Sequence, residues 1–177
     1  PGEMIISAAM GKGKLTVPMS GTSMSGPHMA GVMALMKQFY PELNVAELKS
    51  IVMGTATSIH DEKKQIYPVS RMGAGRVQID KALASAVATQ PASLSLGEVL
   101  VESKKVMYKE IKVHNVRPEA VTFAIEFQGH PALSITGGNV TMPPKGVGVL
   151  GLKIAIDSSK LKNGIEEIDG FVLFTQE

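Results

Sequence analysis

The sequence predicts an α/β half followed by an all-β antiparallel half, and two observations support this division. Up to about residue 89, apolar residues recur at the three- and four-residue spacing of amphipathic helices. Beyond Gln90 and Pro91, apolar residues alternate with polar ones, which is the period of half-buried strands. We therefore expect one domain portion over residues 1–89 and an antiparallel β-sandwich over residues 90–177.

In the first half, one strand and three helices are expected. Met4–Ile6 is an apolar run typical of a buried strand, whereas residues 11–20 are rich in Gly, Lys and Pro, as loops are. The apolar spacing predicts helices over residues 22–40, 44–54 and 78–88. Asn44 followed by Glu47 predicts a capping box at the start of the second helix. Residues 58–75 contain charges, Pro and Gly, which indicates a loop or a short hairpin.

In the second half, several segments show the two-residue period of strands. They contain Ile111 and Val113, Val121–Phe127, Leu150–Ile156, and Phe171–Phe174. Turn signals such as Gly137-Gly138-Asn139 separate these segments. Short strands with a turn about every ten residues are typical of a sandwich.

The composition is that of a folded protein with little net charge. Of 177 residues, 44% are hydrophobic and 19% are charged, which excludes wholesale disorder. Lys and Arg number 18 against 16 Asp and Glu, so the formal net charge is +2. This balance, together with the absence of Trp, argues against a nucleic-acid partner. The longest uncharged run, residues 15–36, is interrupted by Pro, Gly and Ser, so we expect no membrane span.

Cysteine is absent, which excludes disulfides, cysteine-ligated zinc and thiol catalysis. The sequence shows no signal-peptide pattern and begins with Pro1 rather than Met. These features favour a fragment or a processed product.

One motif has the chemistry of a nucleophile. Residues 21–31 read Gly-Thr-Ser-Met-Ser-Gly-Pro-His-Met-Ala-Gly, which puts Ser23 in a Gly-bounded turn where the first helix is expected to begin. A serine hydroxyl there lies at the positive end of the helix dipole, and its backbone N–H is an unpaired first-turn donor. Such an N–H can bind a developing oxyanion. From these residues alone, a structural helix start in front of a buried face is the simpler interpretation.

Residues 21–31 closely resemble the nucleophile motif of the subtilisin-like serine proteases, Gly-Thr-Ser-Met-Ser/Ala-x-Pro-His-x-Ala-Gly. The strand before the motif, Tyr40–Leu43 with the following helix, and Gly73–Val77 with Ala82-Leu83 resemble further parts of the same family. The resemblance covers about residues 1–88. It implies the last part of an α/β, mainly parallel-sheet catalytic domain.

The resemblance implies that Ser23 is the nucleophile of peptide-bond hydrolysis through an acyl-enzyme, and that the Ser23 N–H supplies half of the oxyanion hole. The family order is Asp, His, then Ser. The Asp, the His and the oxyanion amide are therefore expected upstream of this chain. The expected partners are a peptide or protein substrate and the N-terminal part of the catalytic domain. We expect the isolated chain to be inactive, because it holds no positioned base.

None of the four histidines is expected to replace that base. His28 lies five residues after Ser23, about 140° round a helix, so its side chain points away. We expect His60, His114 and His130 to be solvated surface residues, and no metal-ligand spacing joins them.

Two acidic pairs, Asp61-Glu62 and Glu166-Glu167, are the places where calcium could bind, and the family resemblance alone makes calcium possible. Each pair lacks the spaced carboxylates and the Gly of a dedicated calcium loop. We expect solvated faces at both places and assign no cofactor and no metal site.

Residues 92–177 resemble, less sharply, the fibronectin-type-III-like domain that follows the catalytic domain in large cell-envelope subtilases. Tyr108–Asn115 looks like a strand of that domain ending in a Val-x-Asn turn, and Asp169–Val172 looks like its final strand. The resemblance implies a protein that is secreted or in the cell envelope. The sequence leaves an alternative open, which is a non-catalytic binding or structural module that retains part of a protease fold.

Overall fold

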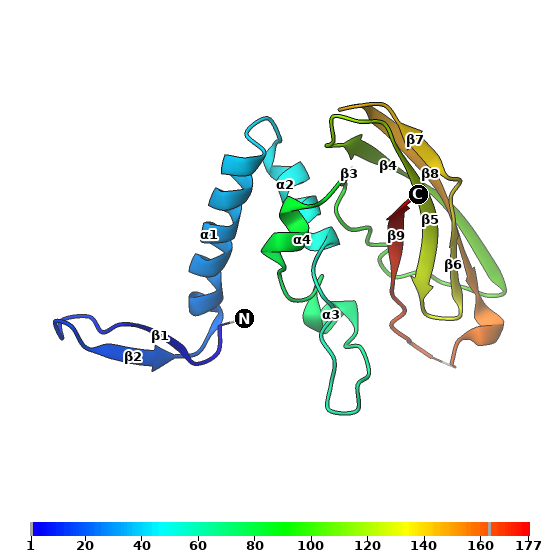
Figure 1. Ribbon diagram of the computed structural model, residues 1–177. Coiled ribbons are helices and arrows are strands. Elements are labelled where there is room, and N and C mark those ends of the chain that lie inside the picture. Colours follow the sequence, from blue (N-terminus) through cyan, green and yellow to red (C-terminus); the bar gives the residue numbers. More distant parts are fainter. Residues whose placement is uncertain (1, 163) are drawn as a thin grey trace. The chain divides into compact units, whose positions relative to one another are not determined.

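The structure is a computed structural model that describes residues 2–162 and 164–177 (Figure 1). Its elements group into two compact units, which divide between Leu43 and Asn44. Among the described residues, the first unit contains two strands and one helix, and the second contains three α-helices, a 3-10 helix and seven strands. The nucleophile motif and most of the strands therefore belong to different units.

A β-hairpin opens the first unit. Strand β1 (Ile5–Ala8) runs antiparallel to β2 (Thr16–Met19), with Ile5 opposite Met19. The expected strand at Met4–Ile6 is thus present, but it is not buried, since Ile6 is 71% exposed. The loop expected over residues 11–20 is wrong in its second half, where β-branched side chains favour the extended backbone of β2.

The parallel sheet implied by the family resemblance is not found in the described part of the chain. Every strand pair in residues 2–162 and 164–177 is antiparallel. A parallel pair needs a crossover connection of about a dozen residues or more, whereas residues 9–15 lead β1 directly back along β2. The described residues therefore combine helices with antiparallel sheets, and the parallel sheet of the complete catalytic domain stays a prediction.

Helix α1 (Thr22–Phe39) agrees with the helix predicted over residues 22–40. Beyond its end, the Lys37 ammonium donates to the carbonyl oxygens of Pro41 and Leu43, at 2.6 and 2.9 Å, which holds the chain after the last turn. Several large apolar side chains of α1 are exposed, namely Met29, Leu35 and Phe39.

Three helices begin the second unit: α2 (Val45–Gly54), α3 (Val69–Met72) and α4 (Ile79–Leu83). The capping box predicted at the start of α2 is confirmed. The Asn44 side chain accepts from the Glu47 N–H at 3.0 Å, and the Glu47 carboxylate accepts from the Asn44 N–H at 2.9 Å. A bridge between His60 and Ile66 forms the short hairpin expected within residues 58–75.

The helix predicted over residues 78–88 is wrong beyond Leu83. Residues Val87–Gln90 form strand β3, which pairs antiparallel with β4 (Lys104–Asn115). The hydrogen bonds to β4 and the β-branched residues of β3 outweigh the four-residue apolar spacing that favours a helix. The predicted domain boundary at residues 89/90 falls inside β3, and separate folding of residues 90–177 stays a prediction.

Two antiparallel sheets complete the second unit (Figure 1). The further strands are β5 (Val121–Gly129), β6 (Leu133–Thr136), β7 (Val140–Met142), β8 (Val147–Asp157) and β9 (Gly170–Gln176), with a 3-10 helix at Ser158–Lys160. The first sheet has the order β3-β4-β8-β6 and the second has the order β7-β5-β9. The strands that the two-residue period predicts are confirmed.

One hydrophobic cluster takes side chains from both sheets. Val113 and Leu152 of the first sheet and Phe123 of the second are at most 1% exposed. Phe123 packs edge-on against Phe174, with ring centroids 6.1 Å apart and ring planes at 78°. The buried members of the cluster are Ile111, Val113, Val121, Phe123, Leu133, Met142, Leu150, Leu152, Ile154 and Ile156.

Hydrogen bonds join α2 to the first sheet within the second unit. His114 of β4 lies 2.8 Å from the Glu47 carboxylate of α2. The Thr89 N–H of β3 donates to the hydroxyl of Ser50, also on α2, at 2.9 Å. Ser50 is only 5% exposed. Helix α2 therefore forms one structural part with β3 and β4.

Candidate active site

Ser23 lies in the first turn of α1, where the sequence predicts it. Gly21 is the N-cap residue, so Ser23 is the second helical residue, and no carbonyl of the helix can reach its N–H. The N-cap residue Gly21 has no side chain that could cap the helix, so no capping side chain occupies the N–H groups of the first turn. The Ser23 side chain is exposed. Its hydroxyl and N–H both lie at the positive end of an 18-residue helix.

Glycines shape the turn before Ser23. Gly21 has a φ of 149°, which favours glycine, and its N–H donates to the Gly2 carbonyl oxygen at 2.7 Å. A Cβ on Gly2 would lie 2.1 Å from the Gly21 carbonyl oxygen, so a larger residue there would push the turn away. The Met4 N–H donates to the Ser20 hydroxyl oxygen at 2.9 Å. The segment before β1 thus fixes the backbone from which Ser23 projects.

Pro27 alters the hydrogen bonding of the same turn, a feature that the sequence reasoning missed. Proline has no N–H, so Pro27 gives no helix hydrogen bond to the carbonyl oxygen of Ser23, four residues earlier. The Ser25 hydroxyl donates to the Gly21 carbonyl oxygen over a long distance, 3.5 Å. The sequence signal for this missing hydrogen bond is the proline four residues after Ser23, because that position would otherwise donate to the Ser23 carbonyl oxygen.

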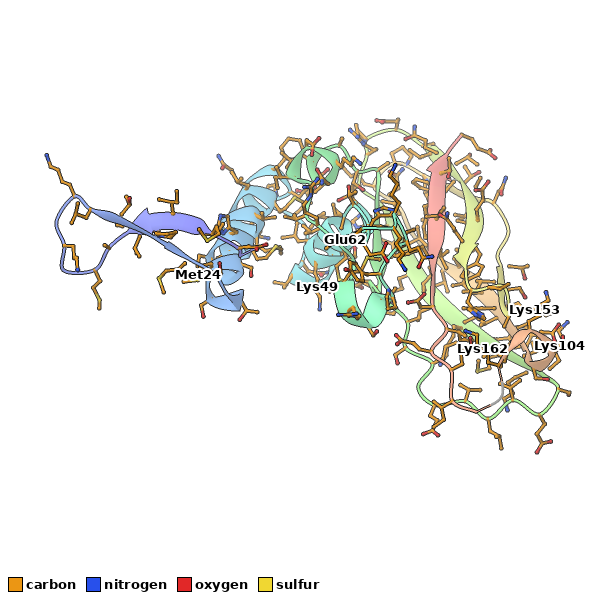
Figure 2. All side chains as sticks on the ribbon, turned by 90° about the horizontal axis from the view of Figure 1, so that it is seen from below. Met24, Lys49, Glu62, Lys104, Lys153 and Lys162 are labelled. Carbon is orange, nitrogen blue, oxygen red and sulfur yellow. The ribbon has the colours of Figure 1, made fainter. Side chains whose placement is uncertain are left out.

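His28 is bonded to the backbone of its own helix. Its Nδ1 lies 2.7 Å from the carbonyl oxygen of Met24, which is labelled in Figure 2. A carbonyl oxygen only accepts hydrogen bonds, so Nδ1 carries the proton and Nε2 is the acceptor nitrogen of the ring. No hydrogen bond joins either ring nitrogen to Ser23 in the described residues. This agrees with the five-residue spacing, which turns His28 away from Ser23.

Two of the other histidines are not the solvated residues that the sequence predicts. The His114 side chain is 17% exposed and pairs with Glu47, and the His130 Nε2 lies 3.5 Å from a Glu166 carboxylate oxygen with 25% of its side chain exposed. His60 is exposed, as predicted. The two-residue period of β4 puts His114 on the face of the strand that points away from the core. The period alone does not indicate that α2 covers this face.

Two of the four acidic residues considered for calcium, Asp61 and Glu166, accept hydrogen bonds from backbone N–H groups. An Asp61 carboxylate oxygen accepts from two N–H groups of its own loop, each at 2.8 Å. Glu166 accepts from the Lys162 N–H at 2.7 Å, which lowers the pKa of the Glu166 carboxyl below its ordinary 4.5. The charges of Lys162 and His130 lower this pKa further, whereas burial opposes them. Within residues 2–162 and 164–177, no group of three or more His, Asp or Glu residues could hold a metal ion.

The site offers two parts of nucleophilic catalysis. The exposed hydroxyl of Ser23 can attack a carbonyl carbon, and its unpaired N–H can bind the oxyanion that then develops. In the described residues, no hydrogen bond joins the Ser23 hydroxyl to a basic side chain. The arrangement has the form of the nucleophile side of a serine-hydrolase site.

Comparison with known protein families gives a match to the part of the chain that contains Ser23. The Subtilase family matches residues 3–75, a range that includes β1, β2, α1, α2 and α3. The N-terminal part of the chain, residues 3–75, therefore belongs to the subtilase family of peptidases. Ser23 lies inside the matched range.

Relatives in this family come from bacteria and plants. The chain is 29% identical to the Minor extracellular protease Vpr of Bacillus subtilis over 150 residues, which cover 83% of this chain and 19% of the relative. It is 37% identical to the C5a peptidase of Streptococcus pyogenes over 94 residues, which cover 48% of this chain and 8% of the relative. It is 42% identical to the Subtilisin-like protease SBT4.3 of Arabidopsis thaliana over 67 residues, covering 38% of this chain and 9% of the relative.

These coverages show that the chain spans less than a fifth of the length of each of these relatives. Among solved structures, the FixG-related protein of Vibrio parahaemolyticus aligns with 44% of this chain and 94% of its own. Its identity of 16% and TM-score of 0.30 assign no fold.

Proposed function

We propose that the chain is the C-terminal part of a secreted or envelope-bound subtilisin-like serine endopeptidase, with Ser23 as its nucleophile. The observation that carries this proposal is the geometry of the first turn of α1. The Ser23 hydroxyl is exposed there, and no carbonyl of the helix accepts a hydrogen bond from the Ser23 N–H. Both groups lie in the range matched by the Subtilase family.

In the complete enzyme, an upstream His accepts the Ser23 proton while the oxygen attacks the carbonyl carbon of a peptide bond. The Ser23 N–H and an upstream side-chain amide bind the oxyanion. The protonated His then gives its proton to the leaving amine, and an acyl-enzyme remains on Ser23. Water, deprotonated by the same His, releases the acyl group as a carboxylic acid and returns the proton to Ser23.

The isolated chain holds the nucleophile without a base. The five-residue spacing turns His28 away from Ser23. His114 and His130 pair with Glu47 and Glu166. We therefore expect no peptide hydrolysis at an enzymic rate from the 177 residues alone.

The two sheets are proposed to form a fibronectin-type-III-like sandwich that orients the catalytic domain. In support, both sheets contribute to one cluster, and α2, which lies in the matched range, is hydrogen-bonded to β3 and β4. The sheets take no chemical part in the reaction.

The proposed partners are a peptide or protein substrate and the N-terminal part of the catalytic domain. The proposed location outside the cytoplasm rests on a relative whose name calls it extracellular. No helix in the described residues is long and apolar enough to cross a membrane.

The test uses the longer protein that contains this chain together with the upstream Asp and His. Ser23→Ala should lower kcat by on the order of 10⁴–10⁶ and abolish labelling by a fluorophosphonate probe. The matched control is Ser25→Ala on the same helical turn, whose hydroxyl donates to the Gly21 carbonyl oxygen, and it should keep activity and labelling.

Two results would sink the proposal. Activity that survives Ser23→Ala would assign the nucleophile elsewhere. A folded, complete protein that neither cleaves peptides nor labels at Ser23 would favour the non-catalytic binding or structural module.

A further inference from the structure

Two adjoining hollows lie over the first sheet, within the second unit. The larger has a volume of about 520 Å³ and includes Tyr108, Glu110, Gly151 and Lys153 in its lining. The smaller, of about 300 Å³, includes Glu110 and Lys112. Glu110 belongs to both, so the two hollows form one shallow groove across β4 and β8, and we refer to it below as the β4–β8 groove.

Four residues of the β4–β8 groove point away from the hydrophobic cluster. Tyr108 pairs with Lys153 and Glu110 with Gly151 in the ladder between β4 and β8, and both pairs alternate with the buried pair Ile111 and Leu150. Side chains that alternate along a strand point to opposite faces, so these four residues face outward.

An open aromatic platform forms the centre of the groove. Tyr108 is 73% exposed, and a Cβ on Gly151 would meet no atom within 4 Å. The missing side chain at Gly151 leaves the space beside the Tyr108 ring empty. A phenol ring offers an apolar face and a polar tip, so it suits a flat ligand that carries hydroxyl groups.

Charged side chains surround the platform without partners. In the part of the chain that the structure describes, Glu110, Lys112 and Lys153 make no hydrogen bond or ion pair through their side chains. The charged residues that line the two hollows are Lys109, Lys112 and Lys153 against the single acidic residue Glu110. Lys153 and Lys104 of this sheet are labelled in Figure 2. The groove therefore favours an anion.

We infer that the β4–β8 groove binds an acidic polysaccharide. A sugar ring stacks on Tyr108 over Gly151, its carboxylate pairs with Lys153 or Lys112, and a sugar hydroxyl donates to Glu110. The exposed ring of Tyr108 and the open space at Gly151 suit a flat sugar ring, which favours a polysaccharide over an acidic peptide.

The test measures binding of polygalacturonate to the full chain by isothermal titration calorimetry, with neutral dextran and poly-glutamate as matched ligands. Polygalacturonate should bind, and more weakly as salt rises. Tyr108→Ala and Lys153→Gln should each weaken binding by about tenfold. Gly151→Val should fill the platform and weaken binding while the melting temperature stays unchanged or rises, since a β-branched residue suits a strand.

The control variant is Lys81→Gln, which removes an exposed Lys of α4 outside the groove and should leave binding unchanged. Absence of polygalacturonate binding would overturn the inference. Binding that is unchanged in Tyr108→Ala and Gly151→Val would also overturn the inference, because the attraction would then depend on charge and not on the groove. Poly-glutamate binding as tight as that of polygalacturonate would assign the groove to acidic peptides instead.

Discussion

The two units of the chain use their apolar residues in opposite ways. In the first unit, Ile6 is 71% exposed and Phe39 is 58% exposed, although this unit carries the proposed nucleophile Ser23. In the second unit, Phe123 and Leu152 are each 1% exposed within a cluster built from two sheets. The contrast teaches that the unit with the proposed nucleophile exposes large apolar side chains, whereas the second unit buries them in a core.

Because buried apolar area is the main source of stability, the second unit should supply most of the free energy of unfolding. Two phenylalanines, one in each unit, allow a direct check. Phe123→Ala should cost about 3–5 kcal/mol, since it leaves a cavity beside Phe174. Phe39→Ala removes the same atoms from an exposed position, where the ring packs edge-on against Tyr40 with ring centroids 4.8 Å apart, and should cost about 0.5–1.5 kcal/mol. Urea denaturation of both variants gives the two values, and equal costs would break the comparison.

A buried polar residue should produce the next largest effect. Asn115 is fully buried, and its amide donates to the carbonyl oxygens of Glu119 and Pro143 at 2.7 and 3.0 Å. Asn115→Ala leaves these carbonyls without their donor and should cost about 1–3 kcal/mol. Asn139→Ala, which removes one exposed hydrogen bond to Glu177, should cost much less. Equal shifts of the denaturation midpoint would contradict this assignment.

A smaller effect should depend on pH. The pKa of the Glu166 carboxyl is lowered in the folded state, so its ionised form stabilises the second unit. This contribution is complete above the ordinary pKa of 4.5 and is lost as the pH falls through the lowered folded pKa. Glu166→Gln should therefore lower the melting temperature at pH 7, and the difference from the parent should vanish near pH 3. A constant difference at both pH values would mean that the ionised carboxylate is not the cause.

Local patterns predicted much of the fold. The capping box of Asn44 and Glu47 was readable because both partners lie within one turn. The strands around Val113 and Phe123 were readable because one face of each meets the core and the other does not. The error at Val87–Gln90 arose because pairing with β4 depends on residues far along the chain, which a local period does not register.

The candidate site was partly predictable, because its residues lie close together in the sequence. Ser23, Gly21 and the start of α1 follow from one contiguous motif, and the structure puts the serine in the expected turn. The pairing of His114 with Glu47 was not predictable, because the two residues are 67 positions apart and no local sequence pattern links them. Contacts that join separate elements depend on tertiary packing.

Hydrogen exchange of the full chain, followed by mass spectrometry, tests the central contrast most directly. Amides of α2 should exchange as slowly as those of β4 and β8, because α2 is bonded to the first sheet. Amides of β1, β2 and α1 should exchange faster by on the order of 100-fold. Equal protection of α1 and β4, or an α2 that exchanges together with α1 rather than with β4, would contradict the account.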